Sequence, residues 1–265
     1  ILHSARCLEF KTVESAQLAA NNLDELGIDA LIIIGGDGSF RGAEHLSQHW
    51  DGQVIGLPGT IDNDIYGTDA TIGYYTAIET AVSSIDKVRD TADAFERIFL
   101  VEVMGRHAGF IALNAALASA SDHVIVPELF ENPDSAIEDM LAELAYRRET
   151  HGSISYVVVI AENVWPGGLR ELVSTLEQRT GSEVRPVILG HVQRGGSPVP
   201  QDRILASKLG THADAAVEEG ASGIMMGEKD SHPESVPLPI TWQKRKELEP
   251  FCVKTMRELV NATTD

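Results

Sequence analysis

The chain has 265 residues, of which 43% are hydrophobic and 23% are charged, and its formal net charge is −19 at pH 7. This length and composition suit one large or two smaller folded domains, and the negative charge disfavours nucleic acid or an anionic membrane as a partner. Two cysteines without metal-binding spacing favour a reducing, cytoplasmic setting, and no apolar run is long enough to span a bilayer.

Apolar runs alternate with helical patterns along the whole chain. Strands are expected at 30–34, 54–57, 98–103, 124–126, 157–161, 187–189 and 223–226. Helices are expected at 71–89, 109–118, 134–148, 168–179 and 202–219, followed by a loop at 228–239 and a final helix at about 242–260. Strands that alternate with helices predict βαβ units, so the predicted fold class is α/β with mainly parallel sheets.

The clearest candidate sites follow the first two strands, which are apolar and expected to be buried. The runs GGDGS (35–39) and PGTIDND (58–64) bring glycines, hydroxyls and carboxylates to strand ends, where open α/β sheets bind ligands. Glycine lets a phosphate approach the backbone, Ser39 is expected to cap the next helix, and Asp37 is a candidate Mg²⁺ ligand. Either Asp62 or Asp64 can accept a proton from a hydroxyl. Together the runs predict a small-molecule kinase, although each alone is also typical of a turn.

Later strand ends carry candidate groups for binding anions and sugar hydroxyls. Arg106 ends the run MGR, and His191 and Arg194 lie in the run GHVQRGGS at 190–197. Arginine suits planar, bidentate contact with phosphate. Glu162, at the end of another strand, is a candidate for binding hydroxyls. A surface ion pair for Arg106 and a structural hydrogen bond for His191 are the alternatives at this point.

With these runs in place, the sequence resembles the ATP-dependent 6-phosphofructokinase family. The resemblance covers about residues 4–210 and rests on SAR, GGDGS, PGTIDND, TIG, VEVMGR, GHVQRGGSP and DRILAS, in the order of the family. It implies a phosphofructokinase-like fold of two Rossmann-like, three-layer α/β/α lobes. It also implies transfer of the γ-phosphoryl group of ATP to the 1-hydroxyl of fructose 6-phosphate, with Mg²⁺ as cofactor, in a homotetramer.

The resemblance also implies roles for single residues. Asp62 is implied as the proton acceptor, with Thr60 and Asp64 beside it, and Arg106 as the arginine that stabilises the transition state. Nucleotide contacts are implied for Arg6, Cys7, Gly36, Asp37, Gly38 and Ser39, with Asp37 linked to Mg²⁺. Substrate contacts are implied for Thr60, Ile61, Asp62, Arg97, Met104, Gly105, Arg106, Glu162, Arg185, His191, Val192, Gln193 and Arg194. In the family, the counterparts of Arg97 and Arg185 reach the site of a neighbouring subunit.

The family pattern also suggests how the chain is divided. It implies the remainder of an ATP-binding lobe at 1–72 and a sugar-phosphate-binding lobe at 73–205. Residues 206–265 would be return helices and a carboxyl-terminal segment that partly packs on the first lobe. The family begins with a strand and a glycine-rich loop that precede this pattern, so an amino-terminal part is expected to be missing.

Departures from the family concern the phosphoryl donor and regulation. In pyrophosphate-using relatives Gly38 is replaced by aspartate and Gly59 typically by lysine, so the two glycines favour ATP. Arg89 and Asp122 are the possible effector contacts, but 151–155 lacks the lysines of the bacterial effector site, so regulation of that kind is doubtful. Two alternatives stay open: a pyrophosphate-dependent enzyme, and a non-catalytic sugar-phosphate-binding or regulatory subunit or inactive fragment.

Overall fold

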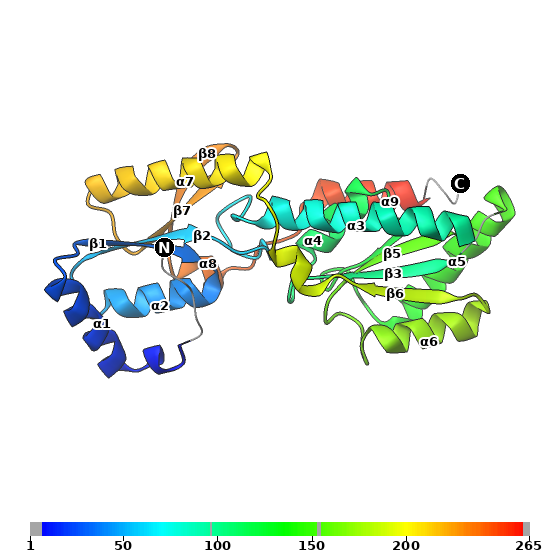
Figure 1. Cartoon of the computed structure of the whole chain (residues 1–265), viewed down its shortest axis with the longest axis horizontal. Coiled ribbons are helices and arrows are strands. Elements are labelled where there is room, and N and C mark those ends of the chain that lie inside the picture. Colours follow the sequence, from blue (N-terminus) through cyan, green and yellow to red (C-terminus); the bar gives the residue numbers. More distant parts are fainter. Residues whose placement is uncertain (1–6, 96, 153–154, 262–265) are drawn as a thin grey trace. The chain divides into compact units, whose positions relative to one another are not determined.

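The computed structural model describes residues 7–95, 97–152 and 155–261, and the chain divides into two compact units (Figure 1). Unit 1 comprises Ile1–Thr60, Ile65–Ile72 and Pro200–Lys246. Unit 2 comprises Ile61–Asp64, Gly73–Val199 and Glu247–Asp265. The sequence suggested three parts, with boundaries after residues 72 and 205, and this division stays a prediction.

Unit 1 is a sheet with helices on both faces. Its elements are η1 (Glu9–Lys11), α1 (Val13–Glu25), β1 (Ala30–Gly35), α2 (Asp37–Ser47), β2 (Gln53–Pro58), α7 (Pro200–Glu218), β7 (Ile224–Lys229), β8 (His232–Pro237) and α8 (Ile240–Gln243). The strand order is β1-β2-β7-β8, with only the β7–β8 pair antiparallel. Helices α1 and α2 lie on one face of this sheet and α7 lies on the other (Figure 1).

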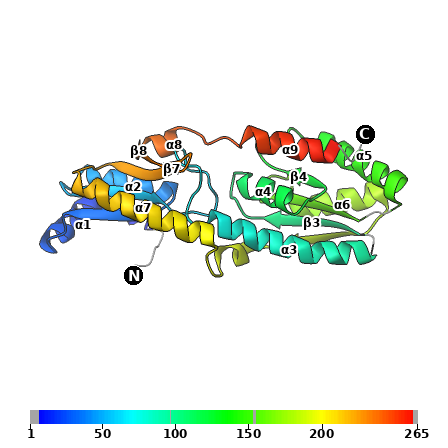
Figure 2. The same cartoon turned by 90° about the horizontal axis from the view of Figure 1, so that it is seen from above.

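Unit 2 is a second sheet between helices. Its elements are α3 (Tyr74–Phe95), β3 (Ile98–Val103), α4 (Phe110–Ala118), β4 (His123–Ile125), α5 (Pro133–His151), β5 (Tyr156–Ala161), α6 (Leu169–Thr180), β6 (Val184–Ile188), η2 (Gly190–Arg194) and α9 (Pro250–Asn261). The order is β4-β5-β3-β6 and every pair is parallel. Helices α3 and α4 lie on one face of this sheet and α6 lies on the other (Figure 1), and Figure 2 shows the unit from the side of α3 and α4.

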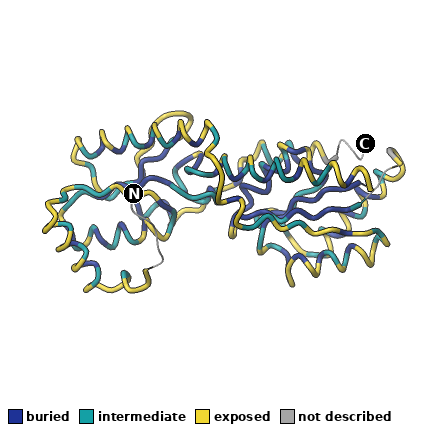
Figure 3. The backbone as a smooth tube through the Cα atoms, viewed as in Figure 1, coloured by how far each residue is buried: buried dark blue, intermediate teal, exposed yellow. Residues whose placement is uncertain are grey.

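The middle of the second sheet is the main core of unit 2. All six residues of β5 are buried, and the tube in Figure 3 is dark along β3 and β5. Alternate strand residues, such as Leu100 and Val158, pack with Met140 of α5 and Leu172 of α6. A parallel strand covered on both faces reads as a continuous run of Val and Ile because neither face meets water. The predicted α/β class with mainly parallel sheets is therefore confirmed.

The prediction that the first strand is buried is wrong for the side chains on one of its faces. Ile32 and Ile34 of β1 are 42% and 64% exposed. Strand β1 is the edge of its sheet, and α7 packs on β2 and β7 rather than on β1. An apolar run therefore identified the strand correctly, but its position at the edge, which the run does not encode, leaves one face uncovered.

The predicted loop at 228–239 is wrong, because most of it belongs to a β-hairpin. Lys229 pairs with His232, and the two residues between them, Asp230 and Ser231, have φ of 50° and 65°. Positive φ at both central positions is typical of the tight hairpin turn that suits twisted strands. Pro233 and Pro237 in β8 hid the strand, but an edge strand tolerates proline because one side of it needs no ladder hydrogen bonds.

The single final helix predicted at about 242–260 is also wrong. Helix α8 ends at Gln243 and α9 begins at Pro250. Proline fits the first position of a helix, whose N–H has no partner within the helix, and interrupts a helix elsewhere. The Glu249 carboxylate accepts hydrogen bonds from the backbone N–H groups of Phe251 and Cys252 at 3.0 and 2.6 Å, which fixes the start of α9 and lowers the pKa of Glu249.

Candidate active site

The run at 35–39 and the start of the second run, residues 58–60, meet in unit 1 at the carboxyl ends of β1 and β2. Gly35 is paired with Pro58, and the N–H of Gly59 donates to the carbonyl of Gly35 at 2.9 Å. A Cβ atom built on Gly36 would lie 3.5 Å from the Cβ of Thr60. Parallel pairing thus brings the turn after β1 against the hydroxyl-bearing Thr60, at the edge where α/β sheets bind ligands.

The turn after β1 leads directly into α2. The predicted capping role of Ser39 is wrong, because Gly36 is the N-cap residue and the N–H of Ser39 donates to the carbonyl of Gly36 at 2.9 Å. Asp37 lies in the first turn of the helix and its carboxylate accepts a bond of 2.8 Å from Nε of Arg41. This end of α2 therefore presents the side chains of Asp37 and Ser39 and the backbone of Gly38, and the N–H groups of Asp37 and Gly38 precede the first hydrogen bond of the helix.

Asp62 lies in unit 2 among charged side chains from four separate segments. Its pKa is raised to about 6, chiefly because burial penalises the charged form and next because Asp64 is close. Glu162 raises the pKa further, whereas Arg194 and Arg106 lower it. Since these residues follow β3, β5 and β6, the structure brings together carboxylates and arginines that the sequence places up to 132 positions apart.

The turn that carries Arg106 is held by hydrogen bonds from the neighbouring strand ends. Oε1 of Glu162 accepts from the N–H groups of Arg106 at 2.7 Å and Gly105 at 3.3 Å. The N–H of Met104 donates to Oε1 of Gln193 at 2.7 Å. Every backbone N–H from Met104 to Arg106 is thus bound by a side chain, which orders the turn at the end of β3.

The residues predicted in η2 differ in exposure. His191, Val192 and Arg194 are exposed, whereas Gln193 is 1% exposed. The amide of Gln193 accepts from Met104, and its Nε2 donates to the carbonyl of Ala77 at 3.4 Å. Its polar atoms are therefore bonded to backbone groups, and its direct contact with substrate stays a prediction that this geometry does not favour.

Arg97 and Arg185 lie together in unit 2, at the amino ends of the strands of its sheet, whereas the Arg106 turn lies at the carboxyl ends. Both pair with the carboxylate of Glu183, Arg97 at 2.5 Å. Arg97 precedes β3 and Arg185 is the second residue of β6, so they lie at the amino ends of the strands. The Arg106 turn follows the far end of β3, about 20 Å away at ~3.3 Å per residue. Within one chain, the two arginines and the Asp62 group are therefore separated by the length of a strand.

The possible effector residues Arg89 and Asp122 meet in a buried ion-pair group. Nη1 of Arg89 lies 3.7 Å from Oδ2 of Asp122, and Arg147, which was not predicted, pairs with Oδ1. The Asp122 side chain is 2% exposed and Oδ2 also accepts from the N–H of Val157 at 2.7 Å. Burial raises the pKa of Asp122, and the two arginines oppose that rise. An effector role for this pair stays a prediction.

The remaining predicted residues are placed as follows. Arg6 lies outside the described residues. Cys7 is exposed and its thiol donates to Oε2 of Glu9 at 3.8 Å. Ile61 is half-buried in unit 2, beside Asp62. Contacts of Arg6, Cys7 and Ile61 with a nucleotide or a substrate stay predictions.

Three further polar residues near the site were not predicted. Asn63 is buried with φ of 55°, Asn163 has φ of 62°, and burial, followed by the charge of Glu162, raises the pKa of Glu102. Asparagine tolerates the left-handed region better than most residues, so an asparagine directly after a strand or between two aspartates is a recognisable signal of a tight turn. No sequence signal distinguishes Glu102 within its strand.

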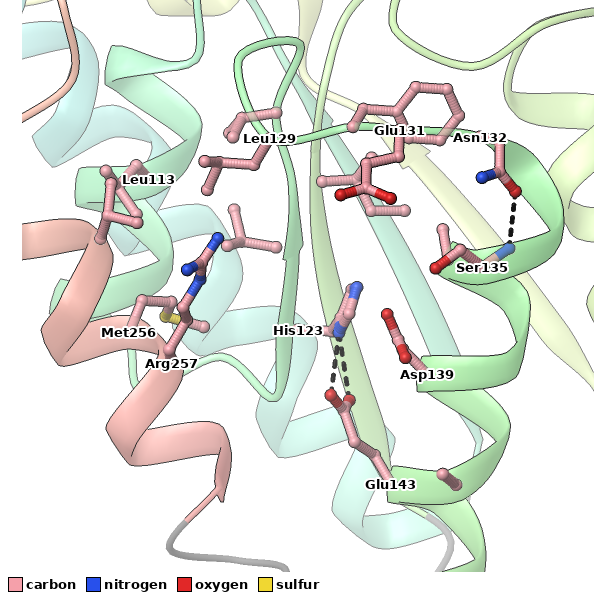
Figure 4. A pocket seen from close by; sticks show the side chains of 17 residues that line it. Leu113, His123, Leu129, Glu131, Asn132, Ser135, Asp139, Glu143, Met256 and Arg257 are labelled. Carbon is pink, nitrogen blue, oxygen red and sulfur yellow. Dashed lines mark hydrogen bonds and ion pairs between the residues drawn. The ribbon is translucent and has the colours of Figure 1, made fainter.

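A cavity of about 490 Å³ in unit 2 lies elsewhere than the predicted residues. Figure 4 shows it between β4, α5 and α9, with His123, Asp139 and Arg257 in its wall. Nδ1 of His123 lies 3.1 Å from both oxygens of Glu143, a buried carboxylate that also accepts from the hydroxyl of Tyr156. Its lining contains none of the residues predicted for substrate, nucleotide or metal.

The described parts of the chain contain neither a membrane-spanning helix nor a cluster of side chains that could bind a metal ion. Across residues 7–95, 97–152 and 155–261, no helix is both long and apolar enough to cross a bilayer. The same residues hold no group of three or more His, Cys, Asp or Glu side chains arranged to bind a metal ion.

Comparison of the sequence with known proteins gives consistent matches. A sequence profile described as Phosphofructokinase matches residues 1–217. The ATP-dependent 6-phosphofructokinase 1 of Thermus thermophilus is 47% identical over 248 residues, which cover 94% of this chain and 76% of that protein. The ATP-dependent 6-phosphofructokinase of Bacillus subtilis is 46% identical, with 85% of this chain and 68% of that protein covered.

Comparison of the structure agrees with these matches. A phosphofructokinase structure from Saccharomyces cerevisiae matches with a TM-score of 0.82 and 32% identity, covering 98% of this chain and 37% of that one. A pyrophosphate-dependent phosphofructokinase from Marinobacter aquaeolei has a TM-score of 0.79 but 20% identity, covering 94% of this chain and 72% of that one, and so supports the fold alone. With its motifs, its two mainly parallel sheets and these relatives, the chain belongs to the phosphofructokinase family.

Proposed function

We propose that this protein transfers the γ-phosphoryl group of ATP to the 1-hydroxyl of fructose 6-phosphate, giving fructose 1,6-bisphosphate and ADP, the glycolytic step. Two findings support the proposal: the ATP-dependent 6-phosphofructokinases of Thermus thermophilus and Bacillus subtilis are 47% and 46% identical to this chain, and the carboxyl group of Asp62 lies close to Arg106 and Arg194 with a pKa raised to about 6. A carboxylate with this pKa is ionised at neutral pH, yet is basic enough to take a proton from an alcohol as its oxygen attacks phosphorus.

The mechanism assigns separate tasks to the surrounding groups. Asp62 accepts the hydroxyl proton, the new bond forms between that oxygen and the γ-phosphorus, and the bond to the β–γ bridging oxygen breaks. Arg106 offers a planar cation to the charge that develops on the transferred group. Arg194 and His191 are exposed in η2 and supply groups for the sugar phosphate. Glu162 orders the Arg106 turn through its backbone bonds.

Mg²⁺ is the proposed metal, and the residues present fit it. Asp37 is a half-buried carboxylate in the first turn of α2, where Ser39 and the end of β2 supply hydroxyls. Magnesium usually binds one or two carboxylates, with phosphate oxygens and water completing its octahedron, so a single aspartate suffices. The ion would neutralise charge between the β- and γ-phosphates, and Arg41, which pairs with Asp37 here, would have to release it.

The space at Gly38 supports ATP as the donor. A Cβ atom built on Gly38 meets nothing within 4 Å, so the fold does not itself require glycine there, and the open space suits a ligand. At Gly59 a Cβ atom would lie 2.7 Å from Cγ2 of Ile34, so packing alone explains that glycine. Gly38 therefore carries the argument against a pyrophosphate donor, and Gly59 adds little to it.

We propose that several subunits assemble, as a homotetramer like that of the family, and the positions of Arg97 and Arg185 support this proposal. Their position at the amino ends of the strands, about 20 Å from the Arg106 turn, keeps them from the Asp62 group of the same chain. If they bind the sugar phosphate, they bind it at the site of a neighbouring subunit. Sedimentation of the wild type and of Arg185→Ala tests the proposal, and an active monomer contradicts it.

A coupled assay on the purified protein tests the proposed function. With fructose 6-phosphate and Mg²⁺, we expect ATP to support turnover at least tenfold faster than pyrophosphate, because the open space at Gly38 accommodates the nucleotide. Chelation of Mg²⁺ is expected to stop the reaction. Faster turnover with pyrophosphate identifies the alternative donor. Calorimetric binding of fructose 6-phosphate without turnover on either donor identifies a non-catalytic sugar-phosphate-binding subunit or an inactive fragment instead.

The pKa of Asp62 predicts the pH dependence of that reaction. The ionised form is the base, so kcat/KM is expected to fall about tenfold per pH unit below about pH 6 and to be level above it until another group titrates. The part of the profile in which kcat/KM falls toward low pH is its acidic limb. Because the charge of Glu162 raises the pKa of Asp62, Glu162→Gln is expected to move this limb to lower pH, independently of any change in the maximal rate. Glu219→Gln, on the surface, is the matched control. A wild-type limb near pH 4 contradicts the assignment of Asp62.

A further inference from the structure

Arg106 has a backbone conformation that its own side chain disfavours. Its φ is 60°, in the left-handed region, and it directly follows Gly105, whose φ is 151°. Outside glycine, this region brings Cβ too close to the following carbonyl, so a residue stays there only where its surroundings hold it. An exposed arginine at the end of a strand has few packing contacts to do so.

The residues that follow β5 bind both backbone polar groups of Arg106. Strands β3 and β5 pair as far as Val103 and Ala161, and the N–H of Glu162 still donates to the carbonyl of Val103 at 2.9 Å. Beyond that point side chains take over from the backbone ladder. Oε1 of Glu162 accepts from the N–H of Arg106 at 2.7 Å, and Nδ2 of Asn163 donates to the carbonyl of Arg106 at 3.1 Å.

Asn163 is suited to this contact in two ways. Its own φ is 62°, so the chain passes through the left-handed region shortly after both β3 and β5, and asparagine is among the few side chains that tolerate this region. A carbonyl needs a donor, and the side-chain amide supplies one where aspartate, of the same shape, has none. Glycine would keep the conformation of residue 163 but lose the hydrogen bond.

We propose that Asn163 is a positioning residue for Arg106, which it holds in the left-handed conformation that directs the guanidinium toward the reacting phosphate. The inference rests on the proposed function and deepens it, because it adds a residue that acts only through Arg106. Consistent with this placement, the positive charge of Arg106 lowers the pKa of Asp62. Transition-state stabilisation depends on groups that are already oriented before the reaction, so a looser Arg106 turn slows turnover.

A double-mutant cycle separates positioning from general damage to the fold. Asn163→Gly is expected to lower kcat/KM about 3- to 10-fold, as loss of one hydrogen bond at an ordered site would. In an Arg106→Ala background the same change is expected to have no further effect, since Asn163 then has no guanidinium to orient. Asn163→Asp, which keeps the shape, removes the donor and adds a negative charge next to Glu162, is expected to lower kcat/KM at least as much as Asn163→Gly does.

Asn132→Ala is the matched control. Asn132 accepts from the N–H of Ser135 at 2.9 Å and caps α5, so this variant should unfold at a lower temperature with unchanged kcat/KM. Asn163→Gly should show the reverse pattern. An unchanged kcat/KM in Asn163→Gly, or an equal loss with and without the Arg106 side chain, overturns the inference. A wild type without phosphofructokinase activity overturns the proposed function, and this inference with it.

Discussion

Asp62→Asn is expected to lower kcat by about 10²–10⁴-fold, the usual contribution of a positioned general base. Asparagine has nearly the same size and shape as aspartate but cannot accept the hydroxyl proton. Binding of fructose 6-phosphate, measured by calorimetry, is expected to stay within a few-fold of the wild type. Asp51→Asn, an exposed aspartate outside the site, is the matched control and should be fully active.

The stability of Asp62→Asn gives an independent check. The folded-state pKa of about 6 is above the ordinary value of 3.8, so neutral Asp62 favours the folded state and this contribution is lost as the pH rises through about 6. At pH 7.5 the wild type carries the penalised charge, whereas asparagine stays neutral. The variant is therefore expected to unfold at a temperature no lower than that of the wild type. A large drop in melting temperature would mean that its inactivity reflects unfolding, and near-normal turnover would end the assignment of Asp62.

Arg106→Ala is expected to lower kcat by about 10³-fold, in the range found when an arginine that stabilises a transferring phosphoryl group is removed. Arg106→Lys keeps a positive charge but loses the planar pair of donors, so it should recover only part of this loss. The alanine variant should also move the acidic limb of kcat/KM to higher pH, because the charge of Arg106 lowers the pKa of Asp62.

The shift of the acidic limb distinguishes a role at the site from a role in folding. Arg170→Ala, an exposed arginine on α6, is the matched control and should change neither the rate nor the limb. A loss of rate in Arg106→Ala without any shift of the limb would place Arg106 away from Asp62. Normal turnover would remove Arg106 from the mechanism altogether.

Several parts of the fold could be predicted because their signals are local. The strand at 98–103 was predicted with the bounds that the structure has, because a run of Ile, Phe, Leu and Val between an arginine and a glycine is typical of a covered strand. The hairpin of β7 and β8 was missed because Pro233 and Pro237 count against a strand unless its place at the edge of the sheet is known.

The sequence by itself determined the α/β class and the family, and the resemblance to that family implied roles for Asp62, Arg106 and Asp37 that stay predictions. These depend on short runs of glycine, aspartate and arginine directly after apolar runs, and the carboxyl ends of parallel strands meet at one edge whatever the details of packing. In unit 1 that rule alone places Thr60 against Gly36.

Only the tertiary structure decided which of the predicted residues use their polar groups to bind other parts of the protein. Gln193, predicted to contact substrate, is buried and bonded to the backbone of Met104 and Ala77. Arg97 and Arg185 share Glu183 at the far edge of the sheet. The pKa of about 6 for Asp62 depends on burial and on charges that follow three other strands. Burial and electrostatic energy are set by neighbours in space, which no local pattern of residues specifies.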